Sequence, residues 1–272
     1  NDLNGEPTYQ YLELKRNEII SFSPDSIIAV GGGSTMDLGK GLALLLTNDS
    51  PALLLKGFPK NINDPLPLIT IPSILGSGSE VSYNAVFIDE AENRKLGINS
   101  KNNFPNKTII DPILSMSAPK KAVVSSAMDS IVHCVDSFGS QKSTPLSLMY
   151  SIKGFHSTLK FFIDDNFDDA KSRLSLAYGS ICGIVALMNS GDGPTNGFAY
   201  YLGVNRRVAH GMAGAVFLID VMNYNIENGF YDYHKLNPEL NFSSNEEKCA
   251  DLIKKLEKIY DAHKIPTLNQ FG

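Results

Sequence analysis

The chain has 272 residues, 43% of them hydrophobic, which is enough to bury one large core or two smaller ones. Its formal net charge is −5 and its Lys and Arg residues are scattered rather than clustered, so neither nucleic acid nor a membrane is expected as a partner. The three cysteines are too widely spaced for a disulfide framework or a Cys-x-x-Cys metal site, which favours a reducing, cytoplasmic compartment.

From the N-terminus to about Ser117, short apolar runs alternate with helical patterns. Residues 8–22 have helical spacing, residues 25–34 (DSIIAVGGGS) are typical of a buried strand that enters a Gly-rich turn, and residues 35–46 continue as a helix. A second buried strand is predicted within residues 65–73 (PLPLITIPS). Strands that alternate with helices favour a parallel α/β layer.

The pattern then changes from strands to helices. Residues 83–100 are expected to form two strands around a charged turn, and residues 107–112 a further short strand closed by Asp-Pro. After Ala118 the spacing is helical throughout, with helices predicted within residues 118–140, 145–163, 170–190, 210–226 and 245–263. We therefore expect an α/β domain at residues 1–117 and an all-α domain at residues 118–272.

Two loops of small residues follow apolar strands and indicate a bound dinucleotide. The first, residues 31–34 (GGGS), opens a helix that carries Asp37 and Lys40 in its first turns, and exposed N–H groups at a helix start favour a phosphate. The second, residues 73–80 (SILGSGSE), leaves another strand, and both loops would lie at the carboxyl edge of a parallel sheet. A tight turn without a ligand is the alternative for the first loop. Neither a GxGxxG motif nor a Walker loop is present, so ATP chemistry is not indicated.

Asp129 and His133 lie four residues apart in a predicted helix, and His210 follows far downstream in VAHG. Positions i and i+4 share one face of a helix, so their donor atoms can reach a single ion. One carboxylate and two imidazoles suit Zn²⁺ or Fe²⁺. The alternative is an ordinary helix ion pair or a pair on the surface.

Four segments give the chain a resemblance to a known family. They are residues 27–41 (IIAVGGGSTMDLGKG), 67–100, 109–140 and 191–225. Their order and spacing resemble those of the iron-containing (group III) alcohol dehydrogenases from about Pro7 to Pro266. The resemblance implies a dehydroquinate synthase-like fold, with an N-terminal dinucleotide-binding α/β domain, a C-terminal helical domain and an active site in the cleft between them.

For the cofactor, NAD or NADP, the resemblance implies contacts from both loops and from the predicted hairpin. The positions that it implies are Gly32, Gly33, Ser34 and Asp37 at or supporting the pyrophosphate, Ser73 and Ser77 beside the cofactor, and Val86 and Lys95 at the riboses. Lys95 could instead be solvated within a charged run. Ile74 stands where the family usually has a threonine, which removes a hydroxyl that touches the cofactor elsewhere.

For the metal, Fe²⁺ or Zn²⁺, the resemblance implies four ligands, of which Asp129, His133 and His210 match. The fourth position holds Asn196, where the family has a histidine. An amide oxygen is a poorer donor than imidazole for these ions, so we expect weaker metal binding and a changed or reduced activity. Tyr200 stands where the family often has another histidine. Tyr200 and His210 are the candidate catalytic residues, and Tyr200 could supply or relay a proton. A packing tyrosine is the alternative.

The resemblance implies an NAD(P)-dependent, metal-assisted oxidoreductase that transfers hydride between a nicotinamide cofactor and a small alcohol or aldehyde. A lyase or cyclase on the same fold is one alternative, which a phosphate-binding cluster of Lys and Arg in the helical domain would favour. A weakened family member, because of Asn196, is another. The resemblance begins inside the family's first domain and ends inside its second. We therefore expect a fragment that lacks the first strand–helix unit and has a truncated helical domain. Its parallel sheet would be incomplete, and the open edge of that sheet favours a homo-oligomer.

Overall fold

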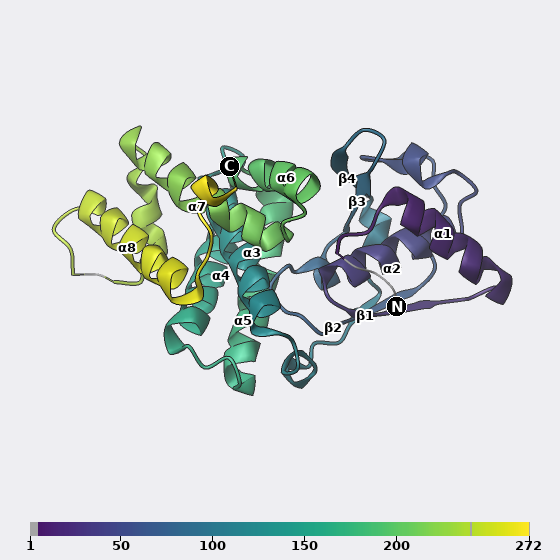
Figure 1. Ribbon diagram of the computed structural model, residues 1–272, viewed down its shortest axis with the longest axis horizontal. Coiled ribbons are helices and arrows are strands. Elements are labelled where there is room, and N and C mark those ends of the chain that lie inside the picture. The colour runs from purple at the N-terminus through teal and green to yellow at the C-terminus, as the bar shows by residue number, and fades with distance from the viewer. Residues whose placement is uncertain (1–4, 240, 272) are drawn as a thin grey trace.

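The computed structural model describes residues 5–239 and 241–271. Its first part, through Ser115, contains all the described strands, and its second part, from Lys120, is built from helices and loops. Figure 1 shows the first part on the right, in purple to blue, and the second on the left, in teal to yellow. The predicted fold class, an α/β part with a parallel sheet followed by an all-α part, is confirmed.

A three-stranded parallel sheet forms the base of the α/β part. β1 (Ile27–Gly31) pairs along its whole length with β2 (Leu68–Pro72), and β2 pairs with β5 (Lys107–Thr108). Because the last residues of β1 and β2 face each other, the loops after both strands leave the sheet at the same edge. α2 (Gly33–Leu45) begins at that edge and packs on the sheet through Met36.

The sheet has one covered face and one open face among the described residues. Ala29 and Leu68 belong to a small core with α2. On the other face, Ile28 is 63% exposed and Val30 is 56% exposed. Strands of a parallel sheet are normally buried on both faces, so the exposure of these two side chains is unusual for such a sheet.

The predicted pair of strands around a charged turn is confirmed, as a hairpin that is separate from the parallel sheet. β3 (Asn84–Asp89) pairs antiparallel with β4 (Arg94–Asn99). α1 (Tyr9–Ile19) packs on this hairpin, and the ring centroids of Tyr9 and Phe87 lie 5.3 Å apart. The hairpin and α1 together cover α2 on the side away from the sheet.

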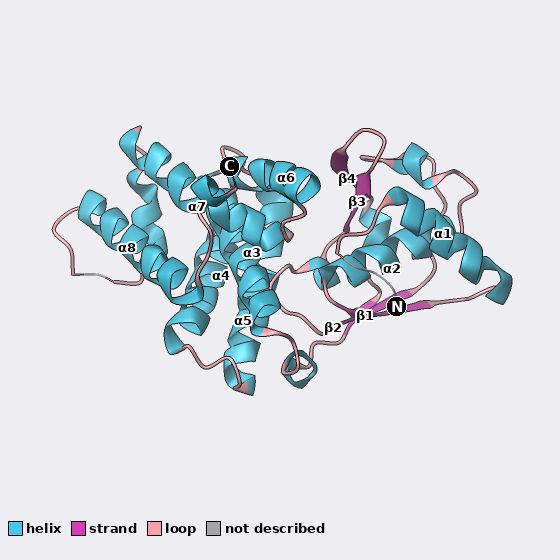
Figure 2. Ribbon diagram, viewed as in Figure 1, coloured by secondary structure: helices cyan, strands magenta, loops and turns pink. Residues whose placement is uncertain are grey.

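α3 (Lys120–Gly139) runs through the middle of the helical part, and nearly all of its residues beyond the first turn are buried. α6 and α7 contact it on one side and α4 and α5 on another, while α8 packs on α7. Figure 2 shows that these helices are joined by loops without strands. Their bounds are α4 (Pro145–Asp164), α5 (Ala170–Ser190), α6 (Pro194–Arg206), α7 (His210–Glu227) and α8 (Asn245–His263).

Glycines let α3, α4 and α5 approach one another closely. A Cβ at Gly154 of α4 would lie 2.8 Å from Cys134 Sγ of α3, and a Cβ at Gly183 of α5 would lie 3.1 Å from the same sulfur. Side chains packed at this density leave little room for movement. α3, which carries Asp129 and His133 on one face, is therefore held rigidly by its neighbours.

α6 was not expected from residue spacing, because PTNGFAYYLG mixes glycine and polar residues without an apolar stripe. Its start is defined by two features instead. Pro194 occupies the first helical turn, where a missing N–H is harmless. The buried Asp136 of α3 accepts a hydrogen bond from the Asn196 backbone N–H at 2.8 Å, which satisfies an N–H group that the helix itself leaves free.

Among the described helices, none is both long and apolar enough to cross a membrane by itself. α5 and α6 together meet the criteria of length and composition, but the chain bends by 106° between them.

Candidate functional site

A cavity of about 1200 Å³ lies between the α/β part and the helical part. Its α/β wall comes from the Gly-rich turn, the loop at residues 73–80 and the β3–β4 hairpin. Its helical wall comes from the first turns of α3, the junction between α6 and α7, and the segment after α8. Both parts of the chain therefore contribute to a single site.

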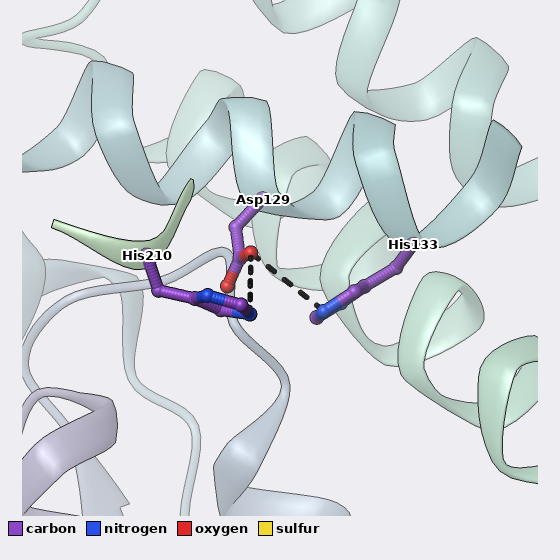
Figure 3. Close-up of side chains that lie close together, drawn as sticks. All are labelled: Asp129, His133 and His210. Carbon is purple, nitrogen blue, oxygen red and sulfur yellow. Dashed lines mark ion pairs between the residues drawn. The ribbon is translucent and has the colours of Figure 1, made fainter. Parts of the chain in front are cut away.

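The structure brings Asp129, His133 and His210 together. α3 places the first two one turn apart, and His210 is the first residue of α7. His133 Nε2 lies 3.7 Å and His210 Nε2 lies 3.9 Å from Asp129 Oδ1. Figure 3 shows the two imidazoles approaching the carboxylate from opposite sides. One donor atom from each residue lies within 4.8 Å of the others, which is a spacing that one metal ion can bridge.

The chemistry of these three residues, which we call the metal trio, fits a divalent ion. Asp129 and His133 are 5% and 4% exposed. Burial raises the pKa of the Asp129 carboxyl and lowers the pKa of His210 well below its usual value, so His210 is neutral near pH 7 and keeps a lone pair to donate. A buried carboxylate with two imidazoles beside it is a donor set that suits Fe²⁺ or Zn²⁺.

Asn196 is buried in the first turn of α6, with 2% of its surface exposed. Its Nδ2 donates to Asp192 Oδ1 at 3.3 Å, whereas its Oδ1 has no hydrogen-bond partner among the described residues. A buried amide oxygen without a donor is an available ligand. Neither Asn196 nor His133 lines the open cavity, so both lie behind its surface.

Tyr200 and Lys95 form a stack against His210. The rings of Tyr200 and His210 are 5.3 Å apart at an angle of 19°, and Lys95 Nζ lies 5.2 Å from the Tyr200 ring centroid. The Lys95 side chain is 6% exposed and pairs with Glu6 Oε1 at 2.6 Å, so the alternative of a solvated lysine is wrong. Burial raises the pKa of Tyr200 far above neutrality, and its phenol therefore keeps its proton.

The loops predicted to hold a dinucleotide lie side by side on the α/β wall. Of the predicted cofactor residues, those that line the cavity are Gly33, Ser34, Asp37, Ser77, Val86 and Lys95. Gly32 is the N-cap of α2 just behind this surface, and Ser73 donates its backbone N–H to Gly31 O at 2.8 Å. A Cβ at Gly33 would lie 2.9 Å from Ser77 Oγ, so a side chain at this position would displace the Ser77 hydroxyl of the neighbouring loop.

The structure adds cavity residues that sequence reasoning did not select. Glu6 reaches the cavity from the segment before α1, and no motif marks it. Four exposed cations of the helical part also line the cavity, namely Lys120, Lys121, Arg207 and Lys264. They come from three segments that are distant in sequence, so only folding shows that they face one space.

Two family models match the chain. "Iron-containing alcohol dehydrogenase" matches residues 1–112, and "Fe-containing alcohol dehydrogenase family, C-terminal" matches residues 123–271. Alcohol dehydrogenase 4 of Schizosaccharomyces pombe is 30% identical over 218 residues, which are 79% of this chain and 51% of that protein. An alcohol dehydrogenase of Thermococcus barophilus is 28% identical over 277 residues, covering 98% of this chain and 71% of that protein.

A solved structure of an alcohol dehydrogenase from Oenococcus oeni has the same fold. It superposes with a TM-score of 0.91 at 23% identity and covers 99% of this chain and 72% of its own. The chain thus spans between about half and about three quarters of the length of these three proteins. The fold expected from the resemblance is confirmed.

Proposed function

Because the chain belongs to the iron-containing alcohol dehydrogenase family, we propose that it forms the site of an NAD(P)-dependent hydride transfer between a nicotinamide cofactor and a small alcohol or aldehyde. One observation carries the proposal. Asp129 and His210 of the metal trio line the same cavity as Gly33 and Ser34 of the Gly-rich turn. The residues that would hold a metal and those that would hold a dinucleotide therefore face one space.

The α/β wall would bind the cofactor. Backbone N–H groups at the start of α2, around Gly33 and Ser34, would face the diphosphate, which the helix macrodipole also attracts. Val86 and Lys95 of the hairpin line the same cavity, with Lys95 beside Tyr200, and would flank the ribose and nicotinamide. The proposal covers NAD and NADP alike, because the phosphate contact is common to both.

The metal trio would hold a divalent metal, Fe²⁺ or Zn²⁺, with Asn196 Oδ1 as the fourth ligand. When bound, such an ion supplies Lewis-acid stabilisation of the negative charge that develops on the substrate oxygen. Tyr200 would keep the His210 ring in place by stacking on it. Its protonated hydroxyl is the proposed group that passes a proton to or from the substrate oxygen.

The proposal includes a small-molecule substrate, a cytoplasmic location and a homo-oligomer as the associated state, without a nucleic acid or membrane partner. Asn196 favours a second form of the proposal, in which the chain binds dinucleotide but turns over slowly. The lyase or cyclase alternative would be favoured by a cluster of cations that binds substrate phosphate groups. Such cations line the cavity, namely Lys120, Lys121, Arg207 and Lys264. A dinucleotide carries such groups too, so these cations are equally compatible with an oxidoreductase.

Absorbance of NADH or NADPH, followed with short aldehydes and with Fe²⁺, Zn²⁺ or no metal, tests the proposal. We expect consumption of the reduced cofactor that requires metal. Asn196→His should increase metal content, measured by elemental analysis, and the rate together, because imidazole binds these ions better than an amide. Asn228→His, at the exposed C-cap of α7 and away from the cavity, is the matched control and should change neither. No turnover with any metal, in wild type or in Asn196→His, would refute the hydride transfer.

A further inference from the structure

A buried lysine lies beneath the two loops that face the cofactor. Lys40 belongs to α2 and its side chain is 0% exposed. Its Nζ donates to Ser79 Oγ at 2.8 Å and Ser82 Oγ at 3.2 Å, and also to the backbone oxygen of Asn84. It lies 3.2 Å from Asp37 Oδ1. Although Lys40 is close in sequence to the proposed phosphate position, its ammonium group points into the protein.

Asp37 is the member of this cluster that borders the cavity and carries negative charge. Its side chain is 15% exposed, and its Oδ1 accepts hydrogen bonds from Lys40 Nζ and, at 2.5 Å, from Ser79 Oγ. A lone carboxylate here would repel the negative charges of a dinucleotide diphosphate. Lys40 places a positive charge directly behind it.

We propose that Lys40 is a positioning residue for the dinucleotide, which neutralises Asp37 and ties α2 to the loop that carries Ser79 and Ser82. The start of α2 then presents its N–H groups to the diphosphate without a net negative charge beside them. This role involves no contact between Lys40 and the cofactor. It rests on the proposed function only in requiring that a dinucleotide binds at this wall.

A charge-rescue experiment on the dissociation constant of NADH tests this role. Burial lowers the pKa of Lys40 while the adjacent Asp37 raises it, so titrations at about pH 6 favour the ammonium form of Lys40. At this pH Glu80, whose pKa burial raises to about 7, is mostly protonated and adds little charge to the cluster. Lys40→Met leaves Asp37 uncompensated and should raise the Kd by about tenfold or more at low salt. Lys40→Met/Asp37→Asn removes both charges and should return the Kd to within about threefold of the wild-type value. A double variant that binds no better than Lys40→Met would refute neutralisation.

Lys56→Met is the matched control. It breaks another ion pair of the α/β part, between Lys56 Nζ and Asp89 Oδ2 at 2.6 Å, at residues that do not line the cavity. Its Kd for NADH should equal that of the wild type, while thermal unfolding reports whether each variant folds. If Lys40→Met does not fold, Asp37→Asn decides the question. Removing this negative charge should tighten NADH binding at low salt and less so at high salt, and weaker binding would overturn the proposal.

Failure of this inference can be distinguished from failure of the proposed function. NADH binding by wild type together with an equal Kd for Lys40→Met would refute only the role of Lys40. If wild type does not bind NADH, the proposed function is refuted. The Kd values of the same variants are then measured and compared with inorganic pyrophosphate as the ligand. The rank order should be the same, because the effect acts on the diphosphate, and an unchanged Kd or no binding at all would refute Lys40 as well.

Discussion

Glu80 should give the chain a pH dependence of stability that can be measured. Its side chain is 1% exposed, and its Oε1 has no hydrogen-bond partner among the described residues. Burial raises its pKa from the ordinary 4.5 to about 7. A pKa that is higher in the folded state means that the folded chain holds this proton more tightly than the unfolded chain. The stabilisation is therefore complete below pH 4.5 and is lost as the pH rises through about 7.

Glu80→Gln removes the proton-binding equilibrium of this side chain, because glutamine stays neutral at every pH. The two pKa values differ by about 2.5, which corresponds to about 3 kcal/mol in the free energy of unfolding. As the pH rises from about 4.5 to about 8, the free energy of unfolding of the variant should therefore increase by about 3 kcal/mol relative to that of wild type. Burying an amide changes the free energy of unfolding by the same amount at every pH. This constant cancels, because only the change of the difference between variant and wild type with pH is compared.

Urea unfolding at a series of pH values, followed by circular dichroism, measures this difference. Glu92→Gln, at the exposed hairpin turn, is the control for removing one carboxylate from the same part of the chain. A difference between Glu80→Gln and wild type that stays constant within about 0.5 kcal/mol across the range would refute the assignment of the proton to Glu80.

The metal site and the cofactor loops give three further expectations. Asp129→Asn removes the carboxylate of the metal trio and should weaken Zn²⁺ binding about 100-fold in competition with a chromogenic chelator; unchanged binding would place the metal elsewhere. Tyr200→Phe keeps the ring stacked on His210 and should bind Zn²⁺ like wild type, whereas Tyr200→Leu should bind it about tenfold more weakly; equal loss in both would assign the effect to the hydroxyl. Gly33→Ala puts a methyl group 2.9 Å from Ser77 Oγ and should weaken NADH binding about tenfold by calorimetry, and an unchanged Kd would mean that the loops separate easily.

The features that could be predicted are those that depend on local spacing. Asp129 and His133 were predicted to share a helix face because the residues between them complete one helical turn, and α3 has this geometry. The parallel pairing of β1 and β2 follows from the alternation of apolar runs with helices. His210 carries no local signal beyond VAHG, so its residue type made it a candidate ligand, and the order and spacing of the family motifs supported its grouping with the other two.

The features that sequence did not reveal depend on contacts between distant residues. Glu6 and Lys95 are 89 positions apart, and nothing in either segment indicates that they form an ion pair. Lys40 was placed beside the phosphate position from its neighbours in the chain, but Ser79 and Ser82 lie on another loop and draw its ammonium inward. Helical periodicity cannot report such contacts, because it describes one element at a time.

Asn196 separates the position of the proposed fourth ligand from its chemistry. The first turn of α6 is held by the backbone, since the Asn196 N–H donates to Asp136 Oδ2 at 2.8 Å and a Cβ at Gly193 would meet the same carboxylate. The only side-chain hydrogen bond of Asn196 among the described residues is the long one to Asp192, and its Oδ1 is left free. Exchanging this side chain should therefore change what is offered to the metal without moving the helix. The weakness expected from an amide ligand is then a property of one side chain, and one substitution can reverse it.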